Sequence, residues 1–419
     1  MKGRIGCLMA DCPVKRRVRG HPWMQTERGR LMLLLLCAVL FYALLIAAFN
    51  SISFGQDLMP PGVDAHPDVP FYQERTQALL EGQIPYLDID TESPPLIMYL
   101  MIPAALMGNT LLAYALMFSG YAFITAGLVY SFIRPFGSDR AWLATAAFLF
   151  NPITWTTAVV FIQDEMVVTL FFVLPILLLL VNRGTWSVVA SVLGTMTKVF
   201  SGVLIPLVLL KQKGKDRGKA LVAAILTLVL VSLPFLMLGG EEFLFFFAYY
   251  LSQSGAEGQN EGISVWRFLH DAGLSIPGPI LQLLFVAGTI LVLYLIWKRD
   301  IDPVRSGFLL LMPFFLFFPK IFTCYFIIPF AVLCLLCWDD ARPMALVTAA
   351  AFLAFFSQFF ESFNGSESVL PTDGMWMMAP IMISLTVHAV WLYVSAGMLR
   401  SEGLKDRPPV PDTPPRSDP

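Results

Sequence analysis

Two lysines in this 419-residue chain stand where charge is costly. Lys198 lies in "MTKVF" and Lys320 in "FPKIF", and each separates two short apolar runs. A charged side chain at membrane depth is rare unless it faces a cavity or a partner. Either lysine alone would be explained by a side chain that extends to the lipid headgroups. Two lysines in matching contexts, in different halves of the chain, indicate a site for an anionic ligand.

A third cation, Arg267, lies beside Trp266 in the polar segment "SGAEGQNEGISVWRFLHD". This segment separates "EEFLFFFAYY" from a long apolar run, and we expect it to be a loop over a polar cavity. Arg267 and Trp266 are therefore further candidates for contact with an anionic ligand.

Carboxylates gather in the first long polar segment of the chain. The pattern of residues 68–81 predicts a helix, which places Asp68, Tyr72 and Arg75 on one face at i, i+4 and i+7. Asp68 also begins "DVPF", a good helix N-terminus, so the spacing favours capping and catalysis equally and the two roles are compatible. Asp64, four residues earlier, is the fallback candidate for a catalytic carboxylate.

The turn "FIQDEMV" carries a second polar group. It has no glycine or proline spacer, so we expect the carboxylates of Asp164 and Glu165 close to the membrane surface. Acids at such turns are often only solvated. A functional role is favoured for Asp164, with Gln163 beside it, more than for Glu165.

Acids that face a few cations at membrane depth suit sugar transfer from a polyprenyl phosphate. Lysines would stabilise the charge that develops on a leaving phosphate. A carboxylate would deprotonate the attacking hydroxyl. Nucleotide sugars are confined to the cytoplasm, so a transferase on the outer face needs a lipid-linked donor.

The composition identifies a membrane protein. Hydrophobic residues make up 57% of the chain and charged residues only 14%, against about a quarter in soluble proteins. Apolar runs of about 20 residues, long enough to cross a bilayer, recur along the sequence. We expect an all-α polytopic membrane protein with about twelve transmembrane helices. The net charge of −2 gives no indication of a nucleic-acid partner.

The distribution of positive charge predicts the orientation. With both termini in the cytoplasm and about twelve spans, the cytoplasmic segments hold nearly all of the 28 lysines and arginines. The outer side keeps only Arg75, Lys198, Arg267 and Lys320. This asymmetry matches the positive-inside rule. We therefore expect the candidate site on the outer face of the cell membrane.

The predicted organisation has four parts. The transmembrane module carries a large first outer loop over 50–109, with juxtamembrane helices, and a second outer loop over 239–276. The four parts are a basic cytoplasmic N-terminus (1–30), the transmembrane module (31–340), a C-terminal helix hairpin (341–398) and a disordered proline-rich cytoplasmic tail (399–419).

These motifs resemble those of the GT-C superfamily of polyprenyl-phosphate-sugar glycosyltransferases. The closest branch is similar to the polyprenyl-phosphomannose-dependent α-mannosyltransferases. The resemblance lies in "DVPFYQERTQALLEGQIPYLD", "SPPLIMYLMIPAAL", "NPITWTTAVVFIQDEM", "LGTMTKVFSGVLIP", "NEGISVWRFL" and "FPKIFTCYFIIP". It departs from the family at Ile162, where a glycine is frequent, and at Ser93, where an aromatic residue is usual.

The resemblance implies roles for the candidate residues. Asp68 would be the general base, and Tyr72 would shape the acceptor site. Lys198 would bind the donor phosphate, with Lys320 and Arg267 as further phosphate ligands. The remaining substrate-binding candidates are Arg75, Gln163, Asp164 and Trp266.

The predicted function is inverting transfer of a hexose, with mannose as the first candidate, from a polyprenyl-phosphate donor. The acceptor would be a glycolipid or lipid-linked glycan on the outer face, and membrane lipids are the other expected partners. The "DID" segment with Asp88 and Asp90 resembles a metal motif, but it is short and common, so we expect no metal ion or other cofactor. The alternatives are a lipid or solute transporter and a non-catalytic membrane subunit.

Overall fold

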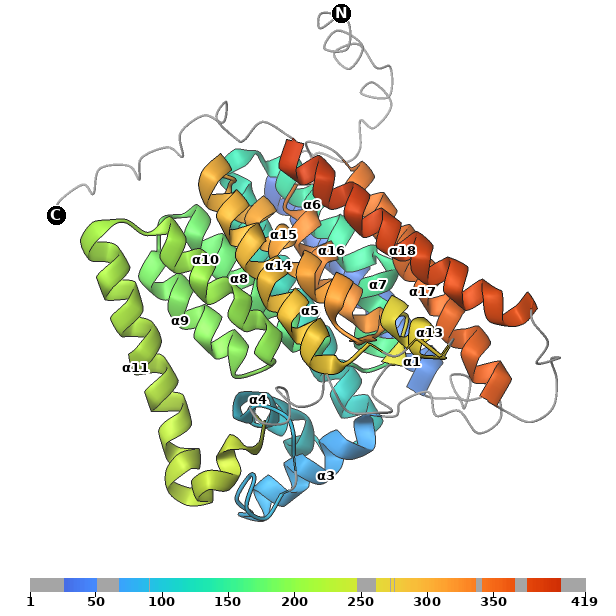
Figure 1. Cartoon of the computed structure of the whole chain (residues 1–419), viewed down its shortest axis with the longest axis horizontal. Coiled ribbons are helices and arrows are strands. Elements are labelled where there is room, and N and C mark those ends of the chain that lie inside the picture. The colour runs from blue at the N-terminus through green and yellow to red at the C-terminus, as the bar shows by residue number, and fades with distance from the viewer. Residues whose placement is uncertain are drawn as a thin grey trace, which may run out of the picture.

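The computed structural model describes residues 26–50, 68–89, 91–246, 261–271, 273–274, 276–336, 341–365 and 375–400. The described part is mainly helical, and its long helices form one bundle (Figure 1). Several predicted features lie outside the described residues: the candidate residue Asp64, Asp90, most of the basic N-terminus and residues 401–419 of the C-terminal tail.

Each apolar segment predicted from the sequence coincides with one or more helices. The helices in these segments are α1 (Glu27–Asn50), α5 (Leu111–Ile133), α6 (Ser138–Phe150), α7 (Pro152–Trp155), α8 (Glu165–Leu180), α9 (Gly184–Thr195), α10 (Leu204–Lys211), α11 (Gly214–Gly239), α14 (Gly278–Arg299), α15 (Pro303–Phe317), α16 (Ile327–Cys334), α17 (Arg342–Gly365) and α18 (Met375–Arg400). The structure confirms a mostly helical protein with several apolar helices.

Five helices among the described residues are long and apolar enough to cross a membrane, or six if one bent pair counts as a single span. The bent pair is α6 with the segment Pro152–Val160, which turn by 48° at Asn151. Pro152 explains the break, because proline disfavours a helical conformation in the residue before it. The expectation of about twelve crossings stays a prediction.

Two helices lie within the predicted first outer loop. These are α3 (Val69–Leu80) and α4 (Pro95–Leu106), which pack together at one end of the bundle (Figure 1). Two consecutive prolines begin α4, where a missing N–H costs nothing. The backbone N–H of Leu96 donates to the carbonyl of Met196 at 2.9 Å, which ties α4 to the break after α9.

The opposite end of the bundle collects segments predicted to be cytoplasmic. There Arg134 pairs with Glu27, and Lys211 pairs with Asp300 at 3.3 Å. The side chain of Arg299 donates to the carbonyl of Leu399 at 3.0 Å, which joins the last turns of α14 and α18. Segments assigned to the same side of the membrane therefore meet at the same end of the bundle.

The chain leaves the helical conformation at both lysines. Lys198 is extended (φ −155°, ψ 124°) between α9 and the 3-10 helix η5 (Val199–Val203). Lys320 lies in the two-residue strand β2 (Lys320–Ile321), which pairs in parallel with β1 (Glu261–Gly262). This strand pair was not expected in an all-α chain, because its partners are far apart in sequence.

Gly262 makes the strand pair possible. Its φ is +69°, and a Cβ atom at this position would lie 1.9 Å from the carbonyl oxygen of Ile321. Only glycine tolerates both this conformation and so close an approach of backbones. The next residue, Ile263, donates its N–H to the same carbonyl at 2.9 Å, which fixes the second predicted outer loop beside Lys320.

Candidate active site

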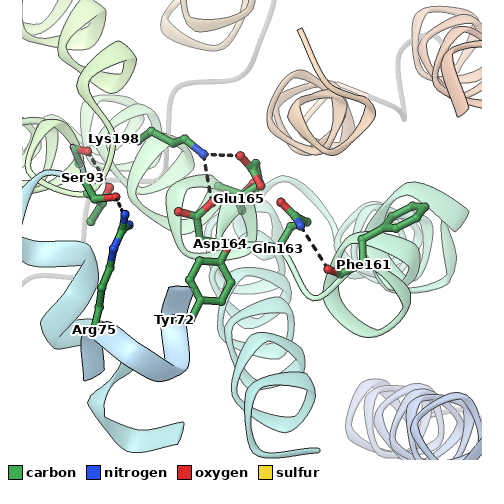
Figure 2. Close-up of polar contacts among 11 residues, drawn as sticks. Tyr72, Arg75, Ser93, Phe161, Gln163, Asp164, Glu165 and Lys198 are labelled. Carbon is green, nitrogen blue, oxygen red and sulfur yellow. Dashed lines mark hydrogen bonds and ion pairs between the residues drawn. The ribbon is translucent and has the colours of Figure 1, made fainter. Parts of the chain in front are cut away.

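A buried charge network lies at the centre of the candidate site. The ammonium of Lys198 donates to Oδ1 of Asp164 at 3.0 Å and pairs with Oε1 of Glu165 (Figure 2). Only 1% of the Glu165 side chain is exposed. Desolvating these charges is costly, so their retention at this position is a feature that packing alone does not explain.

The turn before α8 aims both carboxylates at Lys198. Ile162 has a left-handed conformation (φ 52°) that a β-branched residue rarely adopts. The N–H of Gln163 donates to the carbonyl of Thr157 at 2.9 Å, and α8 then begins at Glu165. Such a turn suits glycine, and this explains why the resembling family often has glycine where this chain has Ile162. Strain of this kind is concentrated at functional sites.

Asp68 faces this network from the start of α3. Its side chain makes no capping hydrogen bond to the helix, so the capping interpretation is wrong for this carboxylate. Its pKa lies above the usual range because of burial and the nearby charge of Asp164, opposed by a hydrogen bond from Gln163 and by Lys198 and Lys320. The structure thus brings both predicted lysines and three of the predicted polar residues to one place.

Tyr72 lies one turn further along α3. Its hydroxyl oxygen accepts the backbone N–H of Asp164 at 3.4 Å (Figure 2). The Tyr72 ring packs against Phe118 with centroids 6.0 Å apart. Burial raises the pKa of the Tyr72 phenol well above its usual range, and Asp164 and Asp68 raise it further. The hydroxyl therefore keeps its proton and can donate a hydrogen bond.

Arg75 occupies the same face of α3, as the spacing predicts. Its guanidinium donates to Oε2 of Glu92 at 2.9 Å and to the hydroxyl of Ser93 at 3.1 Å. Together with Tyr72 and Asp164 it lines a pocket between α3 and α4. The structure therefore joins Arg75 to the candidate site through this pocket.

Arg267 and Trp266 mainly build the wall of the second loop. Arg267 donates to the carbonyl of Gly262 at 3.1 Å, and the indole N–H of Trp266 donates to the carbonyl of Leu316 at 2.7 Å. Both residues lie in α13 (Val265–Asp271), next to the strand pair that holds Lys320. These contacts place them as supports of the loop, and no ligand role follows from them.

Three functional candidates were missed or undervalued by the sequence analysis. Glu165 was ranked below Asp164, yet it is the more buried partner of Lys198. Glu92 pairs with Arg75, and the Tyr325 ring lies 5.1 Å from the ammonium of Lys198. A signal existed only for Glu165, because an acid in the first turn of a helix is favoured by the helix dipole.

Comparison with known proteins identifies the family. No curated protein matches the chain. The model of glycosyltransferase family 87 matches residues 93–319, which is more than half of the chain. This match covers Gln163, Asp164 and Lys198, and begins after α3. It does not favour the alternative of a transporter. The chain belongs to glycosyltransferase family 87 and is a glycosyltransferase.

Proposed function

We propose that the enzyme is an inverting transferase that moves a hexose from a polyprenyl phosphate to a lipid-linked or glycan acceptor on the outer face of the membrane. Mannose is the first candidate for the sugar. One observation carries the proposal. The carboxylate of Asp68 accepts a hydrogen bond from Gln163, in the turn that carries Asp164, and the positive charges of Lys198 and Lys320 are close enough to lower its pKa.

In the proposed reaction, Asp68 accepts the proton of the attacking acceptor hydroxyl. The hydroxyl oxygen forms a bond to the anomeric carbon, and the bond from that carbon to the phosphate oxygen breaks with its electron pair on the phosphate. A carboxyl whose pKa is raised is a stronger base once ionised, which suits this role. A single displacement of this kind inverts the anomeric configuration.

Two lysines, Lys198 and Lys320, are assigned to the leaving phosphate. Lys198 shares its charge with Asp164 and Glu165, so its attraction for another anion is reduced. Lys320, on the strand pair, has its charge within reach of Asp68 and would share in stabilising that phosphate. Fixed cations at the leaving group stabilise the charge that develops there.

The donor class is tested with purified protein in lipid nanodiscs. Radiolabelled polyprenyl-phosphate hexoses and the matching nucleotide hexoses are offered separately with a panel of glycolipid acceptors. We expect label to reach an acceptor only from a lipid-linked donor. Transfer from nucleotide sugars alone, or no transfer from any lipid-linked hexose, would contradict the proposal.

A further inference from the structure

The two acids beside Lys198 outnumber the charge that they neutralise. The ammonium of Lys198 contacts Asp164 at 3.0 Å and also pairs with Glu165, so one positive charge faces two carboxylates (Figure 2). The ring of Tyr325 lies 5.1 Å from the same ammonium, and an aromatic face attracts a cation. Three groups that attract a cation therefore contact Lys198, and together they weaken its attraction for an anion.

Glu165 is the acid of this pair that water screens least. The side chain of Asp164 is 15% exposed, whereas that of Glu165 is almost fully buried. The second carboxylate oxygen of Glu165, Oε2, has no hydrogen-bond partner among the residues that the structure describes. A charge that water does not reach acts more strongly on its neighbours. Glu165 therefore repels any anion that binds to Lys198.

The start of α8 holds the Glu165 carboxylate in this position. Glu165 lies in the first turn, where the helix dipole favours the charged form of an acid. The hydroxyl of Thr169, one turn later, donates to the backbone carbonyl of Glu165 at 2.7 Å. The acid thus belongs to a regular helix, and a helix holds a functional group more precisely than a loop does.

Sugar transfer changes the charge of the lipid phosphate. A polyprenyl-phosphate sugar is a phosphodiester with one negative charge. When the bond to the anomeric carbon breaks, its electron pair stays on the phosphate, and the product is a monoester whose second pKa is about 6. The product therefore carries more negative charge than the donor. A site governed by lysines alone would hold the product more tightly, and release of a product limits the turnover of many enzymes.

We propose that Glu165 weakens the binding of the phosphomonoester product more than that of the phosphodiester donor, and so favours release of the product. This inference rests on the proposed function, because it takes a lipid phosphate as the ligand of Lys198. The second negative charge, which only the product carries, meets a repulsion from Glu165 that the donor does not meet. Glu165 acts through charge and through Lys198, so it is a positioning residue.

The test compares two lipids with the same polyprenyl chain, a polyprenyl phosphate and its methyl phosphodiester. At about pH 8 the monoester carries nearly two negative charges and the diester one. Equilibrium binding of each tritium-labelled lipid to the full chain in nanodiscs is measured by scintillation proximity. The ratio of the two affinities is compared between proteins, so that partition into the bilayer cancels.

We expect the wild type to bind the diester at least as tightly as the monoester. Glu165→Gln keeps the size of the side chain and removes its charge, so the affinity ratio should shift about tenfold or more towards the monoester. Glu165→Asp keeps the charge and should keep the ratio close to that of the wild type, even where it lowers stability. Glu27→Gln removes an acid from an ion pair at the opposite end of the bundle and should leave the ratio unchanged.

Asp164→Asn provides a second variant, which replaces Glu165→Gln if that protein does not fold. It removes the other carboxylate from Lys198. The ratio should shift in the same direction by a smaller factor, because water screens Asp164 more than Glu165.

Tighter binding of the monoester than of the diester by the wild type would overturn the inference, because a site governed by its lysines behaves in that way. So would an unchanged ratio in folded Glu165→Gln, or in Asp164→Asn where Glu165→Gln does not fold. An equal shift in Glu165→Asp and Glu165→Gln would exclude charge as the cause. Each of these results, with both lipids bound, counts against this inference alone. Failure of the wild type to bind either lipid would overturn the proposed function as well.

Discussion

The ion pairs at the two ends of the bundle have the same chemistry and differ in burial. Arg134 and Glu27 lie at one end, where much of both side chains is open to water. Lys198 and Glu165 lie at the other, and the acid is almost fully buried. Exposed pairs contribute little to stability. Charges kept in a buried position at such a cost point to the chemistry of the enzyme.

The largest expected effect concerns Asp68. Asp68→Asn keeps the size of the side chain and removes the base, so we expect turnover to fall by about 10²–10⁴-fold with donor binding near normal. The measurement is the rate of transfer from a saturating lipid-linked hexose, with donor affinity determined in parallel.

Asp64→Asn is the control for this assignment. If Asp68→Asn stays active and Asp64→Asn does not, the base was misassigned and the mechanism stands. Full activity in both variants would rule out the single displacement described above.

Lys198 and Lys211 lie at opposite ends of the helix bundle in similar surroundings, so each serves as a control for the other. Each side chain is 17% exposed, and each is paired with an acid. Lys198→Met should weaken donor binding by about ten- to a hundredfold, because a charge-assisted contact to the phosphate is lost. Lys211→Met should leave donor affinity unchanged. If both substitutions changed donor affinity equally, the assignment of donor binding to the end that holds Lys198 would be wrong.

Stability should distinguish the two ends as well. Glu165→Gln leaves the buried ammonium of Lys198 with Asp164 as its remaining carboxylate, and we expect the free energy of unfolding to fall by about 1.5 kcal/mol. Glu27→Gln breaks a solvated pair with Arg134 and should cost less than Glu165→Gln does. Thermal or denaturant unfolding in detergent measures both. A larger loss of unfolding free energy in Glu27→Gln than in Glu165→Gln would contradict the difference between the two ends.

The smallest effect is a change in pH dependence. Asp68 must be ionised to act as base, so activity is lost as the pH falls through its raised pKa. Asp164→Asn removes a like charge that raises this pKa, so the acid limb of the rate profile should move to lower pH. Asp300→Asn, an exposed acid at the other end, should not move it. A shift to higher pH in Asp164→Asn would contradict the assigned base.

Local patterns predicted much of this structure. Apolar runs located the helices of the bundle. The i, i+4, i+7 spacing placed Tyr72 and Arg75 on one face of α3, where both line the same pocket. These features depend on residues a few positions apart, which is the range over which periodicity is informative.

Contacts between distant segments could not be predicted in this way. The pairing of Lys198 with Glu165 and the strand pair at Gly262 and Ile321 each join separate segments of the chain. The same limit applies to the partnership of Glu92 with Arg75. The left-handed conformation of Ile162 could not be predicted either, because a β-branched residue rarely adopts it.

The central claim is that the end of the bundle that holds Lys198, Asp164 and Glu165 faces outwards and uses a lipid-linked donor. The side of the membrane on which this end lies is the most direct test of that claim. Cysteines are placed at the exposed positions of Gln83, which follows α3 at the end of the bundle that holds the site, and Lys215, in the first turn of α11 at the opposite end (Figure 1). Labelling of intact cells by an impermeant thiol reagent is measured above that of the parent protein. The account predicts labelling of Gln83→Cys and protection of Lys215→Cys. Labelling of Lys215→Cys with protection of Gln83→Cys would place the site in the cytoplasm and contradict the account.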